Sequence, residues 1–291
     1  MKLKFLSVVL IAGLLFLFAG MGFGQERINA AEWTEKIGQG KVNWSAGYIE
    51  AVGIGATPDR TISKTGARPV ALRAAKVEAY RNLLEIAKGV RVDSTTTVKD
   101  YTSESDVVNT QVEGLVKGGV IVDQRYEPDG TVEVRVRMPL HGNLAQVVIP
   151  ASLEKRKNLK PGEPPSVPQP VAATPAPLQV YTGLIVDARG LQARPAMLPR
   201  ILDEDGKEVY GTANVDRECA VSQGMSGYAR DLAAARSNQR VTENPITIKG
   251  LRTGGAGSAD IVISNADARQ ILASAENASF MKKCRVMIVL D

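Results

Sequence analysis

The chain has 291 residues, a net charge of +5, one histidine and two cysteines. A single histidine makes a histidine-dependent catalytic triad or a multi-histidine metal site very hard to build. The positive charge is small and forms no basic stripe interleaved with aromatic residues, which argues against nucleic acid as a partner.

The first 24 residues have the pattern of a secretory signal. Lys2 and Lys4 precede an apolar stretch at residues 5–19, and small residues stand three and one positions before Gln25. We therefore predict cleavage between Gly24 and Gln25 and a periplasmic mature protein. Cleavage six or seven residues later, or an uncleaved membrane anchor, are the alternatives. No cysteine lies near the cleavage zone, so a lipid anchor has no acceptor thiol.

The remaining chain is longer than one hydrophobic core usually organises, and a proline-rich segment divides it. We place a first domain at residues 25–158, a linker at 159–177 and a second domain at 178–291. The seven prolines of the linker favour an extended conformation, so we interpret it as a spacer of up to roughly 60 Å that separates the domains. A basic cluster at residues 155–160 is either a solvated helix end or a contact with an anionic membrane surface.

The first domain opens with one or two strands at residues 42–57. Gly53 and Gly55 in this segment indicate a bend, a bulge or a close approach of another backbone. A long helix is predicted from Pro69 to Lys88, because Pro69 suits a first helical turn and Gly89 suits the end.

Two apolar stripes at spacings of three and four residues run along this helix. One stripe contains Val70, Ala74, Val77, Tyr80, Leu84 and Ala87, and the other contains Leu72, Ala75, Ala79, Leu83 and Ile86. Arg81 and Glu85 lie on the opposite, polar side. We expect a sheet to cover the wide apolar face.

Strands are predicted at residues 90–99, 120–125 and 131–138. In the last of these, apolar residues alternate strictly with charged ones, which is typical of a strand buried on one face. The turn Pro128-Asp129-Gly130 joins the last two strands as a hairpin. Short helices are expected at residues 105–117 and, interrupted by Pro150, at 143–155.

The second domain is expected to mix strands and helices. Its strands are predicted at residues 178–187, 200–202, 208–210, 246–251, 259–263 and 284–290. Helices are predicted at 228–238 and, opened by a capping box at Ser264, to residue 275. Cys219 and Cys284 are a candidate disulfide in an oxidising compartment, and two buried reduced thiols are the alternative.

No segment carries a complete catalytic, cofactor or metal motif. His141 is interpreted as an ordinary loop histidine. The glycines at 53–55 and 254–257 fail as nucleotide-binding loops, and the sequence Gly224-Met225-Ser226-Gly227 has its second glycine one position too early for a nucleophile elbow. We therefore predict no catalytic residue, no cofactor and no metal ligand.

Residues 71–94 and 112–138 resemble the Lpp-twenty lipoprotein family, which includes the amino-terminal domain of the flagellar assembly protein T. The resemblance rests on the alanine-rich helix with Asn82-Leu83, the spacing of Gly114 and Gly118, and the hairpin. It covers about residues 44–140 and implies an α+β fold with a long helix on an antiparallel sheet. It also implies accessory roles in the periplasm or at the outer membrane. The missing lipoprotein cysteine argues against lipid anchoring here.

We expect a two-domain α+β protein in which a sheet, antiparallel or mixed, packs against helices in each domain. We predict a non-enzymatic envelope protein that acts as a scaffold or flagellar accessory factor through contacts with envelope or flagellar proteins. The alternatives are a module that binds peptidoglycan or anionic lipid, and a cell-wall hydrolase with a carboxylate pair for which Glu50 and Asp123 are candidates.

Overall fold

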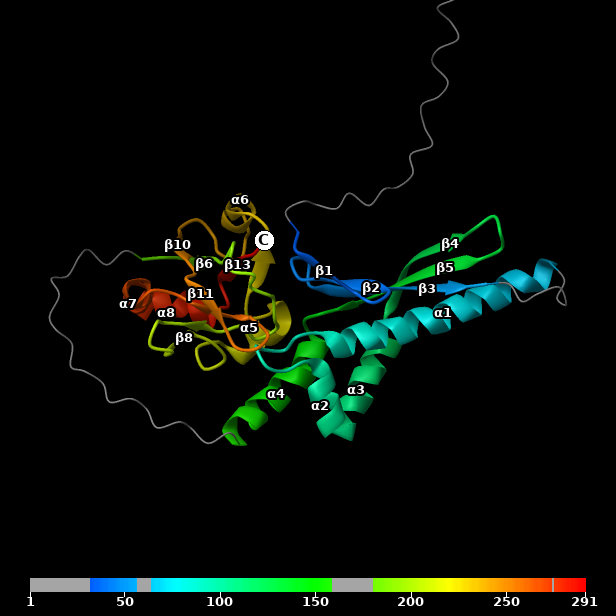
Figure 1. Cartoon of the computed structure of the whole chain (residues 1–291), viewed down its shortest axis with the longest axis horizontal. Helices are drawn as coiled ribbons and strands as arrows, with labels where there is room; N and C mark the ends of the chain where they lie inside the picture. The colour runs from blue at the N-terminus through cyan, green and yellow to red at the C-terminus, as the bar shows by residue number, and fades with distance from the viewer. Residues whose placement is uncertain (1–31, 57–63, 159–179, 274) are drawn as a thin grey trace, which may run out of the picture.

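The computed structural model describes residues 32–56, 64–158, 180–273 and 275–291. The predicted signal with its cleavage site at Gly24 and Gln25, and the proline-rich segment 159–177, lie outside the described residues. The predicted two-domain α+β fold is confirmed (Figure 1). Within the described ranges, no helix combines the length and the apolar character that a membrane crossing requires.

Domain one is a five-stranded antiparallel sheet covered on one face by a long helix (Figure 1). The sheet has the order β1-β2-β3-β5-β4, and its strands are β1 Thr34–Ile37, β2 Gly40–Asn43, β3 Tyr48–Gly55, β4 Val120–Tyr126 and β5 Val132–Pro139. Every second residue of β5 is buried, as its alternating sequence predicts. The expected hairpin is formed by β4 and β5.

Helix α1 (Lys64–Gly89) lies directly on the backbone of β3. A Cβ atom at Gly53 would lie 2.2 Å from the amide nitrogen of Ala79, and one at Gly55 would lie 2.0 Å from the carbonyl oxygen of Ala71. Of the bend, the bulge and the close approach of another backbone that these glycines could indicate, the close approach is therefore correct. Small residues on both elements allow it, because side chains of ordinary size would hold the helix farther from the strand.

Of the two apolar stripes of α1, one is buried from Ala75 to Ile86. Ala75, Ala79 and Leu83 have no exposed surface, whereas Val70 and Val77 from the other stripe are exposed. The buried stripe contains the alanines that meet Gly53 of β3. The helix also begins five residues before Pro69, which therefore lies inside it and not in its first turn.

The strand predicted at residues 90–99 is wrong. A single bridge joins Arg91 to Thr97, and between them the Asp93 carboxylate accepts hydrogen bonds from the amides of Thr95 and Thr96. This local turn takes up backbone donors that a strand would use. These bonds hold the pKa of Asp93 below its usual value against the opposing effect of its burial.

Three further helices complete domain one. They are α2 (Val98–Glu104), α3 (Asp106–Lys117) and α4 (Asn143–Asn158). Ser105 is the N-cap of α3, in agreement with the helix predicted there. Helix α4 continues through Pro150, so the interruption expected at that residue is absent.

Domain two contains two four-stranded sheets, and one of them is wholly parallel, which the sequence did not predict. The parallel sheet has the order β10-β6-β13-β9, with β6 Gly183–Asp187, β9 Gly227–Ala229, β10 Pro245–Lys249 and β13 Val286–Val289. The mixed sheet has the order β11-β12-β7-β8, with β7 Ile201–Leu202, β8 Glu208–Tyr210, β11 Arg252–Gly254 and β12 Asp260–Val262. The predicted hairpin of β7 and β8 is present.

The helices of domain two are short. They are α5 (Arg217–Gln223), α6 (Leu232–Arg236), α7 (Asn265–Leu272) and α8 (Ala275–Lys282). Ser264 caps α7 as its sequence predicts. The helix predicted at 228–238 is only partly correct, because its first residues form strand β9, which pairs with the buried strand β13. Tertiary pairing here overrides a local helical pattern.

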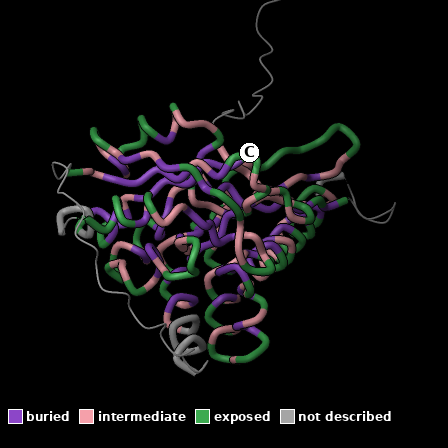
Figure 2. The backbone as a smooth tube through the Cα atoms, turned by 60° about the vertical axis from the view of Figure 1, so that its left-hand side comes forward, coloured by how far each residue is buried: buried purple, intermediate pink, exposed green. Residues whose placement is uncertain are grey.

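The two domains pack directly on each other and share one hydrophobic core. The indole of Trp44 meets the ring of Tyr228 edge to face at 5.8 Å, and Ser45 Oγ donates to the Tyr228 carbonyl at 2.6 Å. The carbonyls of Arg91 and Val92 accept from two consecutive amides of domain two. Buried segments accordingly run through the middle of the molecule (Figure 2). The expectation that the linker separates the domains is therefore wrong.

The predicted disulfide is absent, because Cys219 and Cys284 are both free thiols. Cys284 is fully buried and ends the turn after α8 with φ of 52°. Burial raises the pKa of its thiol to about 11, so the thiol stays protonated. Cys219 packs partly buried against the same core. The structure thus corresponds to the alternative reading, in which both cysteines serve as small apolar side chains.

Candidate functional site

The face of the five-stranded sheet opposite α1 carries a network of charged residues around Glu50. The Glu50 carboxylate is 3% exposed. It accepts from Arg137 Nε at 3.0 Å and lies 3.3 Å from Lys41 Nζ and 3.8 Å from Arg135 Nε. The Arg137 guanidinium also stacks over the Tyr48 ring at 3.9 Å. Three cations thus surround this one buried carboxylate, and Arg135 also pairs with Glu133 at 3.4 Å.

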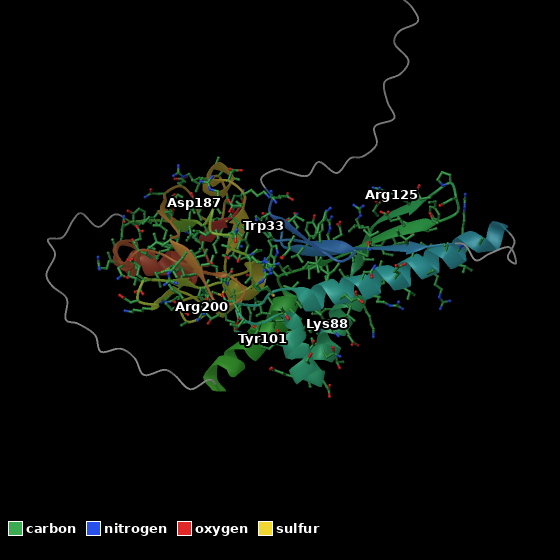
Figure 3. All side chains as sticks on the ribbon, viewed as in Figure 1. Trp33, Lys88, Tyr101, Arg125, Asp187 and Arg200 are labelled. Carbon is green, nitrogen blue, oxygen red and sulfur yellow. The ribbon has the colours of Figure 1, made fainter. Side chains whose placement is uncertain are left out.

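Strand β4 forms one edge of the sheet and pairs only with β5 among the described strands. Three of its apolar side chains, Val120, Val122 and Tyr126, are 64%, 44% and 49% exposed. A register shift interrupts the pairing at Val122, and Arg125 forms an ion pair with Asp123 at 2.9 Å. Figure 3 places Arg125 on the hairpin, at the end of the molecule away from domain two.

The candidate carboxylates Glu50 and Asp123 lie on the same face of the sheet, separated by β5. Arg135 stands opposite Asp123 in the strand register and also reaches Glu50. The hollows that the described residues form along α1, between α3 and α4, and at the domain junction are lined by other residues. The structure thus places both acids on the same face of the sheet, where their partners are cations.

His141 lies at the junction of the two domains, which the sequence did not indicate. Its ring is enclosed by Gly47 of domain one and Gly224 of domain two, both with positive φ, and a Cβ atom on either would come within 3 Å of the ring. Burial, and secondarily the charge of Arg240, lower the pKa of His141 from 6.5 to about 4. The imidazole is therefore neutral at the pH of most aqueous compartments.

Two hollows meet at His141. The smaller has a volume of about 230 Å³, and its polar wall includes Gln223, Ser226, Asn238 and Arg240. The larger has a volume of about 600 Å³ and extends toward α3 past Gly114 and Leu115. A third hollow of about 610 Å³ continues between α3 and α4. Residues of both domains therefore line the two hollows at His141, and the third hollow shares Gly114, Leu115 and Asn143 with the larger of them.

The part of the chain that the structure describes holds no group of three or more histidine, cysteine, aspartate or glutamate residues placed to bind a metal ion. Asp203 and Asp205 lie together in the turn between β7 and β8, where the Asp203 carboxylate accepts from the amides of Asp205 and Lys207. Their arrangement is that of a turn stabilised by its own aspartate.

Comparison with known proteins finds a similarity for the second domain. Residues 183–291 match the family model of the second domain of Tp0624 from Treponema pallidum. The match begins at the first residue of β6 and ends at the last residue of the chain, so it covers the whole second domain as the structure bounds it. No curated protein matches the chain.

Proposed function

We propose that this protein is an exported, non-enzymatic protein of the cell envelope that binds other proteins through the free edge of β4. The observation that carries this proposal is the exposure of Val120, Val122 and Tyr126 on an edge strand of seven residues. An edge strand offers unpaired backbone groups to another chain, and natural proteins usually protect such edges with charges, bulges or a covering element. Here the ion pair of Asp123 and Arg125 and the register shift protect the edge only in part.

The partner that fits this edge is an extended segment of another protein. Backbone hydrogen bonds would give such a segment affinity, and side chains of alternating character would give specificity. Apolar residues would cover Val122 and Tyr126, and an acidic residue would pair with Arg125. The predicted secretory signal and the resemblance of domain one to envelope and flagellar accessory proteins support an envelope or flagellar protein as this partner.

The rival proposal of a cell-wall hydrolase needs a free carboxylate pair. Glu50 is the weaker candidate for such a role because Arg137 and Lys41 already engage its two oxygens. Asp123→Asn tests this rival without disturbing a buried charge. Under our proposal this variant is exported normally and retains the function of the protein in cells.

Site-specific photo-cross-linking in the producing cells tests the edge directly. A benzophenone amino acid at Val122 should capture one defined envelope protein, because this side chain lies on the proposed contact edge. The matched control is Val107, which is 67% exposed on α3 and outside that edge. Equal capture at the two positions, or no capture at Val122 in a folded and exported variant, would contradict the proposal.

A further inference from the structure

We infer that the smaller hollow at the domain junction is a binding site for a small carboxylate ligand, held by Arg240 between the two domains. This site lies apart from β4, and its occupation is independent of the function proposed above. Two observations carry the inference: a cation that keeps N–H donors and has no acidic partner, and a hollow of suitable size against it.

Arg240 is a largely buried cation that is held by backbone carbonyls alone. Its Nη1 donates to the carbonyls of Gly224 and Cys284, each at 2.9 Å, and its Nη2 donates to the carbonyl of Gln223. These carbonyls lie at the ends of α5 and α8, where a cation is favourable. No carboxylate among the described residues pairs with Arg240, and burial lowers its pKa.

The guanidinium retains donors for a ligand. It has five N–H groups, and the three carbonyls account for three of them. Nε and the remaining Nη2 hydrogen are the two without an acceptor in the described parts of the chain. A planar carboxylate accepts hydrogen bonds from arginine in pairs, and it would also supply the missing negative charge.

The Ser226 hydroxyl does not contribute to the site. Its Oγ is fully enclosed and lies beside the Tyr228 hydroxyl, whose pKa its hydrogen bonding lowers against the larger, opposing effect of burial. The Tyr228 hydroxyl also donates to the Ala196 carbonyl at 2.7 Å and accepts from the Ala196 amide at 3.0 Å. Arg240, with Gln223 and Asn238 beside it in the wall of the hollow, therefore supplies the contacts to a ligand.

The hollow limits the class of ligand. Its volume of about 230 Å³ suits a group of the size of one or two amino-acid residues, and the adjoining hollow of about 600 Å³ leaves room for a longer substituent. Arg240 is the one permanent cation in its wall, and His141 is neutral there. A single positive charge matches a monoanionic carboxylate better than a phosphate dianion. A carboxylate at the end of a short peptide therefore fits best.

Isothermal titration calorimetry of the full mature chain tests this inference with alanylalanine as the probe. Alanylalaninamide, which lacks the terminal carboxylate, and inorganic phosphate are the comparison probes. We expect alanylalanine to bind with a dissociation constant of about 1 mM or tighter, and the amide to bind at least about tenfold more weakly.

Substitution of Arg240 could unfold the ends of two helices, so Asn238→Asp is the safer charge test. The Asn238 Oδ1 already accepts a hydrogen bond from the Arg240 amide, and an aspartate oxygen can keep this bond while adding a negative charge at the wall of the hollow. We expect this variant to lose binding. Arg236→Gln on the exposed face of α6 makes the same change in net charge outside the hollow and should bind normally.

Three results would overturn the inference. One is equal binding of alanylalanine and its amide, and another is the absence of binding at about 10 mM probe by the folded wild-type protein. The third is undiminished binding in Asn238→Asp. Binding of phosphate without binding of alanylalanine would overturn the assignment to carboxylates.

Discussion

Gly53→Ala should destabilise domain one by about 3 kcal/mol. The added methyl group would lie 2.2 Å from the Ala79 amide nitrogen and 2.3 Å from the Ala75 carbonyl oxygen, far inside normal contact distance. Both obstructing atoms belong to the backbone of α1, so no side chain can rotate away. The helix must instead withdraw by about 1 Å, which loosens its buried alanine stripe. Overpacking of a core costs about 1–3 kcal/mol, and rigid neighbours place this substitution at the upper end.

Urea unfolding of the mature protein, followed by circular dichroism, measures this effect. Gly114→Ala is the matched control, because a Cβ atom at Gly114 would meet no other atom within 4 Å and the residue lies inside α3. Alanine favours a helix over glycine, so the control should be more stable than the wild type by about 0.5–1 kcal/mol. If Gly53→Ala unfolds at the same urea concentration as the wild type, our account of how α1 contacts β3 is wrong.

Three other measurements test separate parts of the structure. In thermal melts, Leu83→Asp should unfold domain one because it buries a carboxylate in the core. The control Arg81→Ala changes an exposed residue and should alter the free energy of unfolding by less than about 0.5 kcal/mol. As pH falls from 6.5 to about 4, the unfolded chain binds a proton at His141 before the folded chain does, so the free energy of unfolding should fall by about 3 kcal/mol. Urea titrations across that pH range should show no such loss for His141→Gln. Mass spectrometry of the exported protein should find Gln25 at its amino terminus, and an intact Met1 would contradict the predicted cleavage.

Sequence patterns correctly predicted the elements that a turn or a helix cap defines locally. The alternation of residues 131–138 and the Pro-Asp-Gly turn were sufficient for the β4–β5 hairpin, and Ser264 marked the start of α7. The strand predicted at residues 90–99 failed because composition there favours a strand, while the Asp93 carboxylate binds the following amides and forms a turn. Which stripe of α1 is buried depends on the tertiary contact of the helix with β3, and no helical pattern contains that information.

The candidate sites were less accessible to sequence reasoning. The exposed edge at β4 follows from the order of the strands, which a list of strands does not fix. His141 and Ser226 are more than 80 residues apart in the chain and belong to different domains. They come together only because the two domains pack on each other, so neither residue indicates a binding site from its own sequence surroundings. The glycines at 47 and 224 were the available signal, since both enclose the same imidazole, but their partner could not be read from the sequence.

The direct packing of the two domains has a consequence for the continuity of the chain. Contacts such as those of Trp44 and Ser45 with Tyr228 hold the domains together without the covalent connection between residues 158 and 180. A protease cut within that connection should therefore leave the two fragments associated, and fragments produced separately should reassemble. The covalent connection mainly raises the effective concentration of one domain at the surface of the other, and this favours assembly without setting the geometry of the junction.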